Sequence, residues 1–127
     1  MRRVAPLSLV LIVLALAGCG GSKSYSLEDT KACLETRGAQ IGGKLDFVAS
    51  TATGGAFVAG VGQNSVKVVF GETNDDAEQI ELAYDHFALP NVKAGLPDVL
   101  RRQGNAVMLW QEHPQDSDLA LVTGCLK

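Results

Sequence analysis

The chain has 127 residues, with 11 Lys and Arg against 14 Asp and Glu and a formal net charge of −3. This length suits one domain built on a single hydrophobic core. The acidic balance argues against nucleic acid as a partner, because neutralising phosphates requires a basic surface.

The N-terminal segment has the pattern of an export signal. Arg2 and Arg3 precede an apolar run over residues 4–17. As a helix this run spans roughly 21 Å, less than the ~30 Å hydrocarbon core of a bilayer. A secretory signal therefore fits better than a permanent transmembrane helix.

The apolar run ends in Leu16-Ala17-Gly18-Cys19. This motif resembles the lipobox of bacterial lipoproteins, in which an aliphatic residue and two small residues precede a cysteine. The resemblance implies that residues 1–18 are removed and that Cys19 carries a diacylglyceryl group and further acyl chains such as palmitate. It also implies an extracytoplasmic protein held on a bacterial membrane by its lipid, either the outer face of the plasma membrane or an outer membrane.

The mature chain then begins with a short tether over residues 19–25, followed by one domain over residues 26–127. The five residues 20–24 are Gly, Ser and Lys, a flexible composition with a reach of only ~12 Å. Loss of two arginines with the signal leaves nine basic residues against fourteen acidic ones. We expect the domain to lie close to the bilayer without broad adhesion to anionic lipids.

Two cysteines remain in the mature domain, Cys33 and Cys125. An even number of cysteines in an exported chain predicts a disulfide, with buried free thiols as the alternative. The pair would close a loop of about 90 residues, for which chain entropy gives at most roughly 4–5 kcal/mol. No other Cys or His stands at ligand spacing beside either residue, so we expect no metal site and no cofactor here.

Helices and strands alternate along the first part of the domain. Ser26 predicts the cap of a helix that Gly38 stops, with Cys33 facing inward. Residues 39–41 favour a short strand. Residues 46–52 suit a short helix or coil, and we favour a helix anchored by Phe47 and Val48.

The middle of the chain predicts a β-hairpin followed by a long helix. Residues 56–61 and 66–71 alternate apolar and other positions around turn residues 62–65. Asn74 or Asp75 then caps an amphipathic helix that Pro90 ends. Its predicted inward positions are Ile80, Ala83, Tyr84 and Phe87.

After this helix, residues 89–104 read as mostly irregular, with one turn from Pro97 to Gln103. Residues 106–110 are apolar on both faces, as a central strand tends to be. The segment after Pro114 suits a helix or a strand, and we favour a helix because Asp116 and Asp118 occupy its first turn. Together these elements predict an α+β fold: a small, mostly antiparallel sheet with helices packed on one face, and a disulfide that fastens the first helix to the last.

The sequence contains no recognisable catalytic motif. The acidic stripe of Glu78, Glu81 and Asp85, with His86 beside it, is the polar face that an amphipathic helix needs. Glu112 and His113 are adjacent, so their side chains would point apart in extended chain, and a solvent-exposed turn explains them better. We therefore predict that the protein is not an enzyme.

The most distinctive surface element is positive charge in the segment after Pro90. Lys93, Arg101 and Arg102 form a candidate interaction loop on an otherwise acidic domain, and loops often carry function. Tyr84 and Trp110 occupy positions that predict core.

Three functional hypotheses remain. The first is a lipid-anchored binding or interaction module near the membrane surface, with an envelope protein as a candidate partner. The second is a solute-binding accessory module with a pocket between sheet and helices. The third is an envelope hydrolase with a dispersed site, which requires Asp85, His86, Glu112 and His113 to converge.

Overall fold

A computed structural model describes residues 24–127; the signal segment and the predicted lipid acceptor Cys19 lie outside the described residues. The elements follow one another as α1 (Leu27–Thr36), β1 (Gln40–Ile41), α2 (Phe47–Ser50), β2 (Ala56–Val61), β3 (Asn64–Phe70), α3 (Asn74–Phe87), α4 (Pro90–Lys93), α5 (Leu96–Val99), β4 (Leu100–Gln103), β5 (Ala106–Trp110) and α6 (Asp116–Cys125). None of the helices within 24–127 is both long enough and apolar enough to cross a bilayer.

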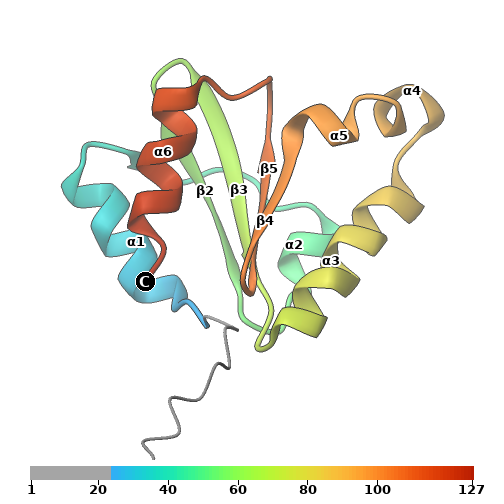
Figure 1. Cartoon of the computed structure of the whole chain (residues 1–127), viewed down its shortest axis with the longest axis horizontal. Coiled ribbons are helices and arrows are strands. Elements are labelled where there is room, and N and C mark those ends of the chain that lie inside the picture. The colour runs from blue at the N-terminus through green and yellow to red at the C-terminus, as the bar shows by residue number, and fades with distance from the viewer. Residues whose placement is uncertain (1–23) are drawn as a thin grey trace, which may run out of the picture.

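The strands form one five-stranded antiparallel sheet in the order β1-β2-β3-β5-β4 (Figure 1). The predicted α+β class and the antiparallel sheet are therefore confirmed. The helices, however, lie on both faces of the sheet rather than on one: α1 and α6 cover the first face, and α2 and α3 cover part of the second. The reason is that β3 and β5 carry buried apolar residues on both sides, such as Val68 and Val69 in β3, and each apolar face must be covered.

The first face holds the larger core. Val66, Val68 and Trp110 pack against Leu34 of α1 and Val122 of α6, all of them buried. A disulfide joins Cys33 of α1 to Cys125 of α6, with 5.4 Å between the Cα atoms. The predicted disulfide and its link between the first and last helices are thus confirmed, and so is the helical choice for the C-terminal segment.

The second face holds a smaller core. Ala77, Ile80 and Tyr84 of α3 pack with Ala49 of α2 against Val69 and Val107 of the sheet. Side chains cap the N-termini of α2 and α3. Asp46 accepts a hydrogen bond from the N–H of Ala49 (2.8 Å), and Thr73 forms a capping box with Asp76.

The predicted ends of α1 are confirmed. Ser26 Oγ accepts from the N–H of Asp29 at 3.4 Å, and the chain turns after the helix at Gly38, whose φ is +87°. The cap of α3 is Thr73, one residue before the predicted Asn74, because its hydroxyl reaches the N–H of Asp76.

Phe47 and Phe87 do not face inward, so these two predictions are wrong. Phe47 begins α2 but is 71% exposed, and the inward residue of this four-residue helix is Ala49. Phe87 ends α3 at 64% exposure, because the last turn of α3 borders a pocket rather than the core. The two exposed rings meet edge to face, with 6.3 Å between centroids.

The predicted irregular segment 89–104 contains two short helices and an edge strand. Pro90 begins α4 rather than simply ending α3, and β4 (Leu100–Gln103) pairs with β5 through a tight turn at Gly104, whose φ is +57°. Two consecutive arginines hide the strand in the sequence, since charged side chains at an edge protect it from further pairing but break the apolar pattern. The first hairpin also turns more tightly than predicted, because Asn64 and Ser65 belong to β3.

Asn105, in the turn between β4 and β5, connects three parts of the chain. It is 2% exposed, and its side-chain amide donates to the carbonyls of Gly71 (2.8 Å) and Tyr25 (3.0 Å). Its side-chain oxygen accepts from the N–H of Tyr25 at 2.6 Å. This residue therefore fastens the start of the domain to the ends of β3 and β5.

We predict that Cys125→Ser lowers the free energy of unfolding by about 2–4 kcal/mol, because the unfolded chain loses its constraint. Chemical denaturation with and without reductant measures the change, with Ala120→Ser on the exposed side of α6 as the control. Alkylation followed by intact mass should detect the thiols of Cys33 and Cys125 only after reduction. Alkylation of both before reduction would contradict the bond.

We also predict that Asn105→Ala costs at least about 2 kcal/mol, because it leaves buried backbone groups of Tyr25 and Gly71 without partners. Asn91→Ala, on exposed α4, should stay within about 0.5 kcal/mol of the wild type. Equal effects of the two substitutions in a denaturation series would show that Asn105 is not the connection described.

Candidate functional site

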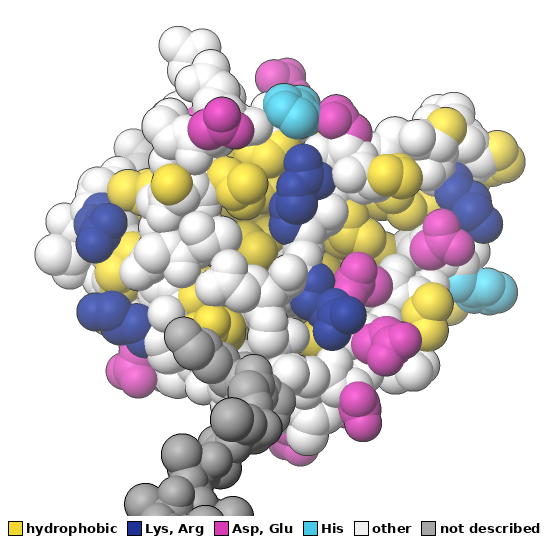
Figure 2. All heavy atoms as spheres, viewed as in Figure 1, with side chains coloured by type: hydrophobic (Ala, Val, Ile, Leu, Met, Phe, Trp, Pro, Cys, Tyr) yellow, Lys and Arg dark blue, Asp and Glu magenta, His cyan; other side chains and the backbone are white. Residues whose placement is uncertain are grey.

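The second face of the sheet is only partly covered, and an open pocket of about 1060 Å³ lies beside α3. Figure 2 shows apolar side chains gathered at a hollow between the sheet and the helices of the 74–99 region. Val58 and Leu109 form the sheet side of the pocket, while α3 supplies Tyr84 and Phe87. Leu96 of α5 closes another side. The volume lies just above the range of about 300–1,000 Å³ that is typical of small-molecule sites.

The loop between β1 and α2 forms a further wall. Gly43 has φ +145°, and a Cβ at this residue would lie 2.9 Å from Cγ1 of Val58. Only glycine lets the backbone cross β2 so closely. The close crossing carries the loop on to Lys44 and Asp46 at the pocket.

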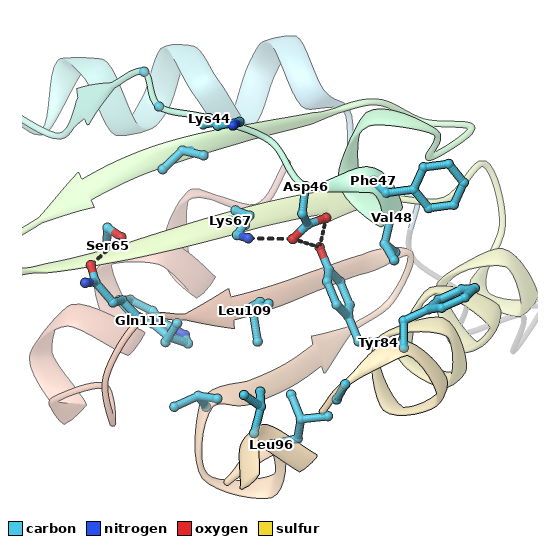
Figure 3. Close-up of a pocket in the computed structure, with 18 residues that line it drawn as sticks. Lys44, Asp46, Phe47, Val48, Ser65, Lys67, Tyr84, Leu96, Leu109 and Gln111 are labelled. Carbon is cyan, nitrogen blue, oxygen red and sulfur yellow. Dashed lines mark hydrogen bonds and ion pairs between the residues drawn. The ribbon is translucent and has the colours of Figure 1, made fainter. Parts of the chain in front are cut away.

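A polar network stands inside this apolar surface (Figure 3). Lys67 Nζ lies 2.5 Å from Asp46 Oδ2, and the hydroxyl of Tyr84 donates to the same carboxylate, with oxygen distances of 3.1 and 3.2 Å. The three side chains come from β3, the start of α2, and α3. One carboxylate therefore joins three elements around the pocket.

The network holds its members in defined protonation states. Burial acts to raise the pKa of Asp46, but the hydrogen bonds from Lys67, Ala49 and Tyr84 and the charge of Lys67 outweigh it, so the pKa lies below its ordinary 3.8. Burial, the Asp46 charge and the Asp46 hydrogen bond raise the pKa of Tyr84 above its ordinary 10.0. At neutral pH Asp46 is therefore a carboxylate and Tyr84 a neutral phenol.

An apolar rim surrounds the mouth of the pocket. We define this rim as Phe47, Phe87, Leu89 and Val92, which are large hydrophobic residues and at least 49% exposed. Three of them also line the pocket. Phe47 and Phe87 meet in this rim, and adjoining exposed apolar side chains often mark ligand or partner sites.

The predicted interaction loop is not one surface. Lys93 lies in α4 and pairs with Asp85 at 3.4 Å, while Arg102 in β4 pairs with Glu81 of α3. Arg101 is the neighbouring residue in the strand, so it points to the opposite face, where its guanidinium donates to the carbonyl of Pro97 at 3.1 Å. Two of the three charges thus neutralise the acidic stripe of α3.

The four residues required for a dispersed hydrolase site do not form one cluster. His113 Nδ1 lies 2.6 Å from Asp98 of α5, while His86 packs on the ring of Phe87 at the end of α3. The two imidazoles appear at well-separated points in Figure 2. Within the described residues, no group of three or more His, Cys, Asp or Glu is arranged to hold a metal ion.

The sequence suggested a pocket between sheet and helices only as an alternative and did not single out Asp46 or Lys67, although two signals pointed to these residues. Lys67 interrupts the apolar pattern of its strand, and Asp46 precedes a short helix as a cap. Tyr84 and Trp110 are buried as predicted, but the hydroxyl of Tyr84 faces the polar network. The contact between residues 46, 67 and 84 depends on the fold.

Comparison with known proteins adds no relative to this description. No protein-family model, no curated protein and no solved structure matches the chain.

We predict that the phenol of Tyr84 ionises only well above pH 10, because the folded protein holds its proton more tightly than the unfolded chain does. Its contribution to stability is complete below about pH 10 and is lost as the pH rises toward the folded pKa. In Tyr25→Phe, Tyr84 is the only tyrosine, so phenolate absorbance follows it directly. An ionisation at the ordinary pKa would contradict the network, and Asp46→Asn should shift the titration toward lower pH.

Proposed function

We propose that the protein is a lipid-anchored binding module of the bacterial cell envelope, and that its ligand occupies the pocket on the second face of the sheet. The anchor part of the proposal rests on the lipobox-like motif at Cys19. The binding part rests on one observation, an open and mostly apolar pocket of about 1060 Å³ that contains a small polar network. Sites for small molecules commonly combine these two features.

The arrangement of side chains favours binding over hydrolysis. The pocket contains Asp46, Lys67 and Tyr84 but neither histidine. Asp46 is already occupied by three donors and its pKa is lowered, which makes it a poor general base.

A second candidate function is contact with an envelope protein through the apolar rim. The exposure of Phe47, Phe87, Leu89 and Val92 supports it. We favour ligand binding in the pocket over contact through the rim. A concave surface buries more of a small apolar ligand than a rim can.

The proposal predicts that an apolar amphiphile in the pocket comes close to the only tryptophan of the chain, Trp110, which packs in the first-face core and also contributes to the pocket lining. The full chain is reconstituted in phosphatidylcholine vesicles and titrated with ω-bromoundecanol and ω-bromoundecanoate, whose bromine quenches indole fluorescence at short range. We expect saturable quenching by at least one of them. Leu109→Phe, which fills the pocket, should weaken it at least about tenfold.

The matched control is Leu82→Phe on an exposed part of α3 that does not line the pocket. It should leave quenching unchanged. Absence of quenching by both probes, or equal quenching in Leu109→Phe and wild type, would contradict binding in the pocket.

A further inference from the structure

We infer that the pocket takes a single-chain amphiphile with a monoanionic oxygen head group, such as a long-chain carboxylate, with the head at Lys67 and the hydrocarbon chain along the apolar side. This inference rests on the proposed function and specifies the chemical class of its ligand. It follows from the hydrogen-bonding capacity left in the network and from the charge of the pocket lining.

The carboxylate of Asp46, the charged acceptor of the network, already receives three donors. The two oxygens of Asp46 receive Lys67, the hydroxyl of Tyr84 and the N–H of Ala49. A ligand donor such as an ammonium group would compete with these donors and with the charge of Lys67 for the carboxylate. The carboxylate therefore positions its neighbours rather than presenting itself to a ligand.

The unused capacity consists of donors. An ammonium group has three N–H donors, and within residues 24–127 Lys67 gives one of them, to Asp46. Lys67 is partly exposed at the pocket, with 27% of its side chain accessible. Gln111 adds an amide group whose oxygen accepts from Ser65, which leaves its N–H₂ available. Such a set is complementary to an acceptor head group.

The charge of the lining agrees with this assignment. The charged residues that line the pocket are Lys44, Lys67 and Asp46, a net charge of +1 on a chain whose net charge is −3. Lys44 forms no ion pair with any described residue. One unit of positive charge matches one carboxylate. Hydrogen bonds between charged groups are also stronger than those between neutral groups.

The apolar part of the pocket accounts for the other half of the ligand. From the polar network, the surface continues over Leu109 of the sheet to Leu96 and Val99 of α5 and Val92 of α4. Figure 3 shows Leu109 and Leu96 on the side of the pocket away from Lys44. A head group at Lys67 can thus extend its chain over apolar side chains, where burial of each methylene is favourable.

The test compares the two brominated probes, which differ only in the head group, on the full chain in phosphatidylcholine vesicles. We expect ω-bromoundecanoate to quench Trp110 at about tenfold lower concentration than ω-bromoundecanol. Lys67→Met keeps an apolar stem of similar size and should remove this preference. Lys31→Met, on α1 and outside the pocket, should retain it.

Asp46→Asn gives an independent and opposite result. Asparagine still caps α2, but it no longer neutralises Lys67, so binding of the carboxylate should strengthen severalfold while binding of the alcohol stays the same. This variant keeps the inference testable if Lys67→Met does not fold.

The outcomes separate the two proposals. Equal quenching by both probes in the wild type would overturn the head-group assignment while leaving the pocket as a binding site, whereas no quenching by either would overturn the proposed function itself. Vesicles that contain phosphatidylglycerol with brominated chains test a bilayer lipid as the source of the ligand. Quenching by that lipid alone would overturn the single-chain assignment, and quenching by the free carboxylate alone would support it.

Discussion

The carboxylate of Asp46 is the contact on which the second face of this domain depends. It caps α2, pairs with Lys67 of β3 and accepts the hydroxyl of Tyr84 from α3. Without it, a lysine would stand unpaired on a half-buried strand face, and removing a charged group from water without a partner is costly. With it, the helices of this face are held at the edge of an apolar surface that they do not fill. The pocket and its polar centre therefore have one structural origin.

The two faces of the sheet are covered in different ways. The first face is closed by α1 and α6, is filled by Trp110 and a set of valines, and is joined across its helices by the Cys33–Cys125 disulfide. The second face carries a smaller core and an adjacent pocket with exposed aromatic rings at its mouth. A closed layer whose helices are joined by a disulfide thus lies behind a layer with exposed apolar surface. This difference between the faces agrees with the proposal that the domain binds its ligand on the second face only.

Local chemistry accounts for the elements that the sequence predicts well. The ends of α1 follow from the hydroxyl of Ser26 and the positive φ of Gly38, and the hairpin follows from strict alternation before and after Gly62. The elements it predicts poorly are those whose signal is not local. Strand β4 contains consecutive arginines and is held by pairing with β5, and Phe47 and Phe87 look like core residues but lie at the mouth of the pocket. In each case the structure of the segment depends on contacts with other parts of the fold and not on its own residue types.

Sequence alone therefore establishes the α+β class, the disulfide pairing and the ends of α1, because each depends on residue type and on spacing along the chain. The lipid anchor remains a prediction of the same kind, carried by Cys19 and the segment before it. The placement of helices on both faces, the dispersal of Lys93, Arg101 and Arg102, and the meeting of Asp46, Lys67 and Tyr84 required the tertiary structure. The members of that network are separated by 21 and 38 positions, and no local pattern encodes which distant side chains the packing of a sheet brings into contact.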